Sequence, residues 1–568
     1  MQCLQSPTAN AVAFASARTH HEEDEHEQRA TAWLARGHDP PGRAAQGGRW
    51  RSGAERERSA RGLREQRQQR RWSDLHRHPV PAQQKLRTGG VLRIGATGGG
   101  AKDTIDAHLP TTDPDIMRQW NMYESLAVRS PDFAQLEMLL AESIEPAGSK
   151  PNAWTVRLKD GIEFHNGKTV GADDVIFSLK RITDPKDPKT GNSSLSYIDR
   201  DNLKKVDERT VRIPLKLTNA AFPDDLGQYF NAIVPTDYDP KKPVGTGPFK
   251  YQSFSPGQRS VFVKNPNYWQ TGRPYADQLT IIDFPDDTAR TNALLGGQVE
   301  AINNLPAAQL ASIRGNPNLK VLSSPTGAWQ PFTMRIDAAP FDDVKVRQAM
   351  RLIVDREQMV QQVLSGQGSV ANDLYARYDP MYASDLPQRK QDLEQAKSLL
   401  KQAGKEGLTV ELVTSPVFNG IVEAAQVFAE QAKGAGVNVK VRKVDTGTFY
   451  GDNYLKWPFA QDFWASRVYL AQVAQGDLPN SPFNETHWGK GKFESLINQA
   501  RGTVDEAKRK EILHEAQQMQ YEQGGYIIPY FSNIIDAYSS KLGGFVEAKS
   551  GFPLGNYWFK NIGFLANT

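Results

Sequence analysis

Residue types that could carry out catalysis are present in this chain, but no motif groups them. A hydrolase needs a nucleophile held beside a base. The sequence has no Gly-x-Ser-x-Gly elbow, and none of His108, His165 and His487 lies in a recognisable triad motif. The glycine-rich segment Gly89–Gly100 lacks the following Gly-Lys-Ser/Thr of a phosphate-binding loop. We therefore predict no catalytic residues and no nucleotide site, and keep a secreted hydrolase as the competing class.

Metal-ligating residues gather in His20–Glu27, whose sequence is HHEEDEHE. A zinc-protease helix needs two histidines four positions apart. Here His21 and His26 are five apart, so adventitious binding is the most that the segment predicts. The single cysteine, Cys3, excludes an internal disulfide and a cysteine-based metal cluster. We expect no metal and no cofactor.

Charge divides the chain into two unequal parts. Residues 1–90 hold sixteen Lys and Arg against ten Asp and Glu, whereas the remaining residues hold 53 against 55. A nearly neutral body argues against a nucleic-acid footprint, and a regulator of that kind would need the basic front to fold as a helix-turn-helix. A chain of 568 residues should form two or three domains, and it has no apolar run long enough to span a bilayer.

Residues 1–87 do not resemble the rest. This Arg-rich segment lacks an apolar face wide enough to pack, so we expect it to be disordered, or a non-native extension of the chain. Binding of nucleic acid or anionic lipid by the arginines is the alternative. Ala9–Ala17 has the small residues of a signal-peptide cleavage site but no positive region before it, so we expect no export signal in the chain as written.

In the body, the hydrophobic pattern predicts both strands and helices. In Glu142–Ile182, alternating apolar residues predict a strand over Trp154–Leu158. Asp173 and Asp174 then place negative charge where a helix begins, and the apolar spacing continues that helix to Ile182.

The C-terminal half predicts alternating helices and strands. One amphipathic helix is expected over Asp342–Gly366 and a shorter one over Leu393–Ala403. A strand at Leu408–Leu412, a helix at Ile421–Ala432 and a strand at Val437–Val441 predict a parallel strand–helix–strand unit. This part of the chain should therefore be α/β.

Two of these segments resemble one known family. Glu142–Ile182 and Val244–Ile281 are similar to the signature of the family 5 extracellular solute-binding proteins, the peptide-binding components of ABC importers. The resemblance begins near Gly89 and implies an α/β, bilobed, periplasmic-binding-protein-like fold of class II with an extra domain, mixed sheets, flanking helices and a hinge. The implied domains follow an extension at 1–87: lobe I at 88–128, 218–308 and 528–568, a small extra domain at 129–217, and lobe II at 309–527.

The resemblance also points to a ligand site. Peptide-binding relatives pair the peptide's ammonium with an aspartate three residues after a tryptophan, and Gln461–Trp488 resembles that stretch. Trp464 fits the aromatic position, but Arg467 replaces the aspartate. A guanidinium favours a carboxylate or phosphate over an ammonium. The alternative for Arg467 is an internal salt bridge with Asp462 or Glu485.

Further candidates follow from the same resemblance. Glu124 lies in a stretch that is near the ligand in relatives, or it is a structural carboxylate beside a basic group. Trp329 could stack on a ligand or pack in the core. Asn484, Thr486 and Trp488 offer polar contacts in a loop that could line the cleft.

The family resemblance implies a non-enzymatic protein that delivers a peptide-like solute to a membrane permease driven by a separate ATPase. An oligosaccharide, a nickel chelate or an opine-like conjugate are alternative solutes. We expect a monomer at the periplasmic or extracellular face of the membrane, associated with it through the transporter and binding no nucleic acid. The lack of a visible export signal departs from the family.

Overall fold

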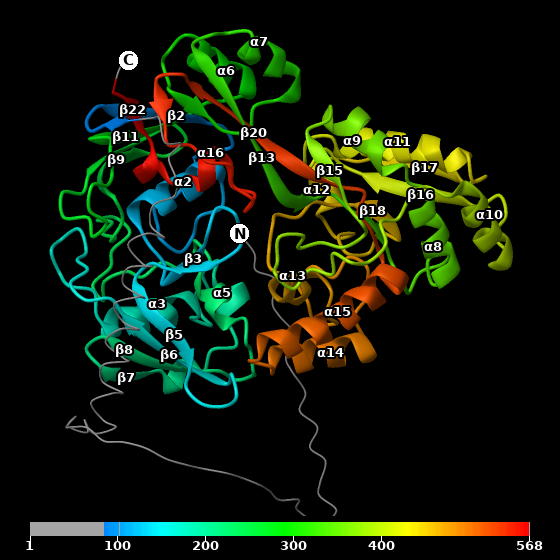
Figure 1. Cartoon of the computed structure of the whole chain (residues 1–568), viewed down its shortest axis with the longest axis horizontal. Helices are drawn as coiled ribbons and strands as arrows, with labels where there is room; N and C mark the ends of the chain where they lie inside the picture. Colours follow the sequence, from blue (N-terminus) through cyan, green and yellow to red (C-terminus); the bar gives the residue numbers. More distant parts are fainter. Residues whose placement is uncertain (1–84, 102, 567–568) are drawn as a thin grey trace, which may run out of the picture. The chain divides into compact units, whose positions relative to one another are not determined.

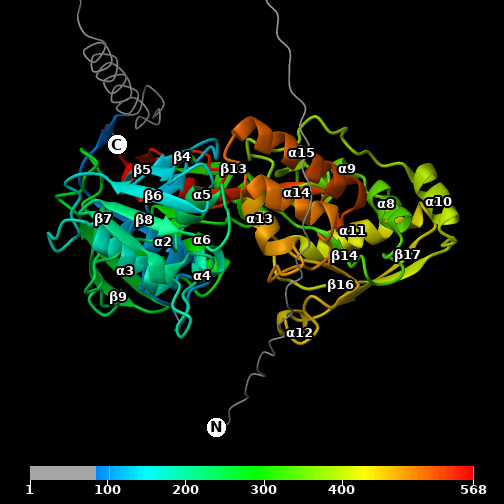
Figure 2. The ribbon, with the colours of Figure 1, turned by 90° about the horizontal axis from the view of Figure 1, so that it is seen from below.

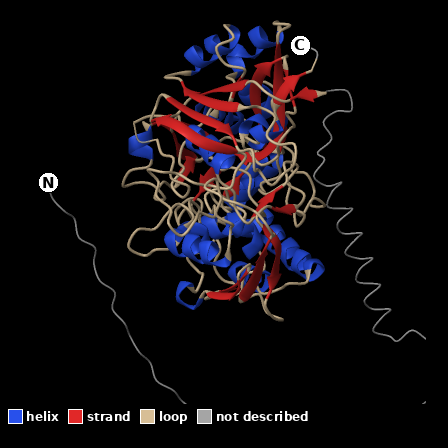
Figure 3. Ribbon diagram, turned by 90° about the vertical axis from the view of Figure 1, so that its left-hand side faces the viewer, coloured by secondary structure: helices blue, strands red, loops and turns tan. Residues whose placement is uncertain are grey.

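The computed structural model describes residues 85–101 and 103–566, which belong to one compact unit, Pro79–Thr568 (Figure 1). The predictions for Cys3, Ala9–Ala17, His20–Glu27 and nearly all of the Arg-rich segment lie outside the described residues. Helices and strands are mixed throughout the described part (Figure 3).

The largest sheet has eight strands and defines lobe I. Its order is β13-β20-β12-β2-β11-β10-β9, with β15 paired to β20. Strand β2 runs parallel to β11 and β12, and the other pairs are antiparallel. The strands are β2 (Val91–Ala96), β9 (Phe249–Ser255), β10 (Arg259–Lys264), β11 (Gln278–Asp283), β12 (Ala301–Ile302), β13 (Leu319–Trp329), β15 (Gly368–Val370) and β20 (Tyr530–Ser539). Strand β2 lies within the glycine-rich segment Gly89–Gly100.

Short elements complete lobe I. Helix α2 (Asp113–Met122) begins at a capping box formed by Thr112 and Asp115. The other elements are α6 (Asp287–Leu295), η2 (Ala307–Gln309), α7 (Leu310–Arg314), α16 (Pro553–Asn556), η3 (Phe559–Asn561) and the sheet of β1 (Leu86–Arg87), β22 (Gly563–Leu565) and β21 (Leu542–Gly543).

A four-stranded antiparallel sheet, β5-β6-β8-β7, forms the small domain. Its apolar residues pack against one face of α3, where Val175, Leu179 and Ile182 are buried. The predicted strand and helix of Glu142–Ile182 are confirmed as β6 and α3. The elements are β3 (Ala127–Arg129), β4 (Leu136–Met138), β5 (Ala141–Pro146), β6 (Ala153–Leu158), α3 (Ala172–Ile182), α4 (Asn192–Leu195), η1 (Arg200–Asn202), β7 (Lys204–Asp207), β8 (Thr210–Pro214) and α5 (Phe222–Leu226).

A five-stranded sheet, β17-β16-β18-β14-β19, defines lobe II. Strands β16 and β17 are parallel and joined through α11, so the predicted strand–helix–strand unit is confirmed. Figure 2 shows α14 and α15 side by side. The elements are β14 (Phe332–Met334), α8 (Val344–Leu352), α9 (Arg356–Leu364), α10 (Leu393–Gln402), β16 (Thr409–Thr414), α11 (Ile421–Lys433), β17 (Asn438–Lys443), α12 (Thr446–Phe449), β18 (Phe459–Gln461), α13 (Tyr469–Gly476), α14 (Lys492–Arg501), α15 (Glu506–Gln523) and β19 (Tyr526–Ile527).

The single helix predicted over Asp342–Gly366 is wrong. The segment forms two helices, α8 and α9, because Asp355 lies in extended conformation and its side chain accepts a hydrogen bond from the backbone of Gln358. That contact caps α9 and breaks the helical path although the apolar spacing continues. The second helix ends at Ser365, which has a left-handed conformation and precedes Gly366.

Strands β13 and β20 run from one lobe into the other (Figure 1). They pair from Leu319 opposite Ser539 to Trp329 opposite Phe531, with an irregularity after Pro325. Residues at one end of β20 belong to the lobe I core, and Tyr530 at the other end packs into the lobe II core. The residue limits predicted for the domains remain predictions.

The turn that links the small domain to β9 depends on close backbone packing at Gly245. A Cβ atom there would collide with the carbonyl oxygen of Met122 and with the Tyr123 ring. The amide and carbonyl of Gly245 also bond to His165. Glycine is therefore required for steric reasons at this position.

Candidate ligand-binding site

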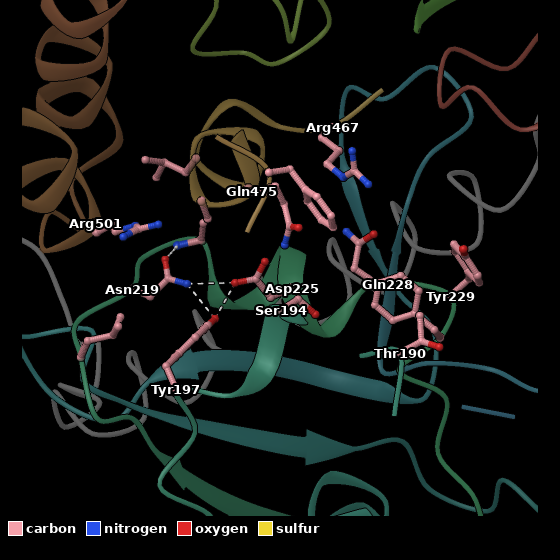
Figure 4. Close-up of a pocket in the computed structure, with 17 residues that line it drawn as sticks. Thr190, Ser194, Tyr197, Asn219, Asp225, Gln228, Tyr229, Arg467, Gln475 and Arg501 are labelled. Atoms are coloured by element: carbon pink, nitrogen blue, oxygen red, sulfur yellow. Dashed lines mark hydrogen bonds between the residues drawn. The ribbon is translucent and has the colours of Figure 1, made fainter. Parts of the chain in front are cut away.

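A cavity of about 300 Å³ lies between two walls that are far apart in the sequence (Figure 4). Residues between Thr190 and Phe230 form what we call the acidic wall, and residues between Arg467 and Arg501 form the basic wall. The acidic wall includes Tyr197, Asn219, Asp225, Gln228, Tyr229 and Phe230. The basic wall includes Arg467, Leu470, Ala474, Gln475, Phe483 and Arg501.

Short helices place these side chains. Helix α5 carries Asp225, α13 supplies the apolar and amide side chains of the basic wall, and Arg501 is the last residue of α14. The walls touch directly, because the backbone N–H of Ala220 donates a hydrogen bond of 2.8 Å to the carbonyl oxygen of Arg501.

Asp225 is the centre of the acidic wall. Its Oδ2 accepts hydrogen bonds from the Tyr197 hydroxyl and, at 2.9 Å, from Asn219 Nδ2. Burial raises the pKa of Asp225 to about 7, and the neighbouring Asp224 adds to the effect. The carboxyl group therefore changes charge near neutral pH.

Arg467 is half-buried on the basic wall. Its Nη1 lies 3.4 Å from Gln472 Oε1, and its guanidinium lies over the Trp464 ring, 5.4 Å from the ring centroid. Burial lowers the pKa of Arg467 from its ordinary value. This cation is thus largely removed from water and contacted by an amide and an aromatic ring.

The internal salt bridge weighed for Arg467 does not form among the described residues: neither Asp462 nor Glu485 comes within 4.0 Å of its guanidinium. Asp462 instead accepts hydrogen bonds from Tyr450 and Tyr454, and Glu485 accepts one from Tyr526.

Two tryptophans support the position of Arg467. Trp329 and Trp464 exchange backbone hydrogen bonds of 3.0 and 2.9 Å, and their rings stack at 5.9 Å. Trp329 also stacks on Tyr375 and is only 1% exposed. It does not line the cavity, so core packing accounts for its contacts.

The remaining candidates lie apart from this cavity. Glu124 is buried and accepts hydrogen bonds from Thr246, Tyr268 and Trp269, at 3.0, 2.7 and 2.9 Å. These contacts are those of a structural carboxylate.

The loop candidates are also occupied by internal contacts. Asn484 donates to the backbone oxygens of Leu478 and Trp488, at 3.0 and 2.9 Å. Thr486 is fully buried, and Trp488 packs on Phe493. The structure does not bring these three side chains together with Arg467.

Sequence reasoning missed Asp225, Tyr197, Asn219 and Arg501. No local pattern marks them: a basic residue at the end of a helix is common because it complements the helix dipole, and short α5 has no clear apolar period. Their common role arises from contact between segments about 270 residues apart, which local spacing does not reveal.

The histidines do not form a catalytic group in the described part of the chain. Burial lowers the pKa of His108 and of His165 to about 4. His487 contacts Asp337. A further histidine, His514, contacts Asp385. No group of three or more His, Cys, Asp or Glu among the described residues could hold a metal ion. None of the helices described combines the length and apolar character that crossing a membrane requires.

Two α/β lobes joined by long strands, with a cavity lined by two arginines and an aspartate, are the arrangement of a solute-binding class of protein. Comparison with known proteins gives the family. The model of the bacterial extracellular solute-binding proteins, family 5 (middle region), matches residues 135–491, and the chain belongs to this family.

Among its relatives are two curated binding proteins. The dipeptide-binding protein of Escherichia coli (strain K12) is 28% identical over 452 residues, covering 72% of this chain and 83% of the relative. Heme-binding protein A of Haemophilus influenzae is 28% identical over 472 residues, covering 76% and 85%. The solved structure of the ABC transporter substrate-binding protein CtaP of Listeria monocytogenes has a TM-score of 0.74 at 20% identity, covering 85% of this chain and all of that one.

These findings confirm the predicted family and the bilobed α/β fold. The family consists of solute-binding proteins and the curated relatives are named for what they bind, so this chain is a binding protein and not an enzyme. Family 5 proteins bind small solutes and work with ABC permease components, and the homologues are periplasmic or extracellular.

Proposed function

We propose that this chain captures a small peptide-like or anionic-conjugate solute in the cavity between its acidic and basic walls, and delivers it to an ABC permease driven by a separate ATPase. It acts as a monomer at the periplasmic or extracellular face of the membrane. The dipeptide-binding relative supports a peptide-like solute, and the heme-binding relative shows how far solutes in the family diverge.

The observation that carries the proposal is Arg467. A desolvated guanidinium without a carboxylate partner is costly, and a bound carboxylate or phosphate would compensate that cost. The Trp329–Trp464 pairing fixes the backbone three residues before Arg467, so the cation is presented from a rigid base. Where relatives with an aspartate attract an ammonium, this chain presents a group that attracts an anion.

The cavity volume restricts the size of the solute. At about 300 Å³ it lies at the lower end of the range usual for small-molecule pockets. A dipeptide or an amino-acid conjugate fits that volume better than a long peptide does. Apolar side chains such as Leu470 and Phe483 leave room for an apolar group between the polar ends.

A ligand screen tests the proposal. The full chain is incubated with dipeptides, oligosaccharides, nickel chelates and amino-acid conjugates, and binding is read from thermal shifts and confirmed by calorimetry. We expect a peptide or anionic conjugate to bind and to be recovered chemically unchanged. Chemical turnover of a bound solute would support the competing hydrolase class, and a stable complex with oligosaccharides alone would contradict the proposed solute.

A further inference from the structure

The cavity contains a second guanidinium that sequence reasoning did not find. Arg501 lines the basic wall together with Arg467, and in Figure 4 the two lie on either side of Gln475. Within the described part of the chain, neither is ion-paired with a carboxylate within 4.0 Å. Burial lowers the pKa of both from the ordinary arginine value.

The backbone of Arg501 is held in place, whereas its guanidinium has no ion-pair partner among the described residues. Its carbonyl oxygen accepts the hydrogen bond from Ala220, which holds the end of α14 against the acidic wall. Arg501 lines the cavity. Its guanidinium interacts electrostatically with Asp225 and Tyr197, but it forms no ion pair with either residue. The guanidinium is therefore placed to meet a solute.

Asp225 supplies a hydrogen-bond acceptor and, when ionised, a negative charge opposite the two arginines. Both hydrogen bonds from Tyr197 and Asn219 end on its Oδ2, which leaves Oδ1 to accept from a donor in the cavity. Among the described residues that line the cavity, Asp225 is the acidic one and the two arginines are the basic ones. The lining thus carries one net positive charge when Asp225 is ionised.

We infer that Arg501 is a second anion-binding residue, and that the solute is a small molecule with two acidic groups and one hydrogen-bond donor, such as an acidic dipeptide. One acidic group binds Arg467 and the other binds Arg501, while an ammonium donates to Asp225. A solute of net charge −1 then neutralises the net charge of the lining, which lowers the cost of desolvating the charged groups. This inference rests on the proposed function and specifies its solute.

The test compares pairs of peptides that differ in one charge and hardly in shape. Calorimetry on the full chain measures the affinity for Ala-Glu and Ala-Gln, and for Ala-Asp and Ala-Asn. We expect each acid to bind at least about tenfold more tightly than its amide, the size of effect that one charge-assisted contact gives. In Arg501→Gln, the affinity for the acid should fall to that of the amide, whereas the affinity for the amide should change little.

Two further variants make the result specific. Arg442→Gln removes an exposed arginine that is paired with Glu411 on the lobe II sheet, and it should leave both affinities unchanged. Arg501→Lys keeps the charge but loses the bidentate fork, so it should retain part of the preference for the acid. It also serves as the readout if Arg501→Gln does not fold.

Equal affinity for acid and amide in the unmodified chain would overturn the inference. An unchanged preference for the acid over the amide in folded Arg501→Gln would also overturn it. That result is expected if Arg501 serves only to pair with Asp225 when the lobes move. A neutral dipeptide that binds as tightly as its acidic partner would overturn the inference but support the proposed function, whereas no binding by any member of the wider screen would count against both.

Discussion

At the scale of single residues, Arg467 follows a pair of tryptophans whose contacts are structural. The rings and backbones of Trp329 and Trp464 are locked together, so the aromatic position is used for support. The family pattern pointed to Trp464 and Arg467 as ligand-binding residues, and that role remains a prediction. It did not indicate that Trp329 is buried beneath them, since an aromatic residue in a strand suits a core and a cleft equally well.

Replacing Arg467 by Ala should weaken binding of the solute by about 1.5–3 kcal/mol, because a charge-assisted hydrogen bond is lost. Calorimetry with the best solute from the screen measures this. Arg442→Ala is the matched control, since that arginine is half-exposed and paired with Glu411. Unchanged affinity in Arg467→Ala would dismiss its role in binding.

Asp477 gives a prediction about pH. It is 1% exposed, accepts hydrogen bonds from Tyr375 and Gln520, and has a pKa raised to about 7 by burial. An unfolded aspartate has a pKa of about 4, so the folded state binds the extra proton between these values. The free energy of unfolding contributed by this group therefore falls as pH rises through the window, by roughly 1.4 kcal/mol per pH unit.

Asp477→Asn should remove that dependence. Urea unfolding of both proteins from about pH 5 to about pH 8 should show the variant gaining stability relative to the unmodified chain as pH rises. Other buried acids with raised pKa values, such as Asp536, are present in both proteins and cancel in the comparison. A stability difference that stays constant across this range would contradict the prediction.

At the scale of elements, periodicity correctly predicted β6, α3, α10, β16, α11 and β17 but not where a helix stops. The apolar face of Asp342–Gly366 is continuous across α8 and α9, and hydrophobic spacing alone cannot register the break. The signal was Asp355, whose side chain competes for the backbone of the next turn. An aspartate inside an apolar period is therefore a reason to test two shorter helices.

Gly245→Ala should destabilise the fold by about 2–3 kcal/mol, because the new methyl group would overlap the Met122 backbone in the turn before β9. Gly148→Ala is the control: a Cβ there meets no atom within 4 Å, so its effect should stay within about 0.5 kcal/mol. Urea or thermal unfolding compares the two. Equal stability of the two variants would show that the turn relaxes.

At the scale of the whole molecule, the cavity depends on two walls carried by different parts of the fold. Sequence reasoning predicted two lobes and a site between them from the family pattern. The cavity that Asp225 and Arg501 line could not be predicted, because it depends on how α5 meets α13 and α14.

Solute binding should slow hydrogen exchange in both walls together. Residues 217–230 and 467–475 should become protected because the solute bridges them and suppresses local opening. Peptides from β16 and β17, in the lobe II sheet, should be unaffected and serve as the internal control. Mass spectrometry with and without the best solute measures this, and protection of one wall alone would contradict closure around the solute.

Strand β20 has a consequence for how the polypeptide is made. It lies between β13 and β12 in the largest sheet, yet it comes from residues 530–539, whereas the sheet of lobe II is complete once residue 527 has been added. During translation lobe II can therefore fold while the sheet of lobe I still lacks a central strand. Until that strand emerges from the ribosome, the edges of β12 and β13 are exposed to pairing with other chains, which makes this interval the one in which a chaperone is most needed.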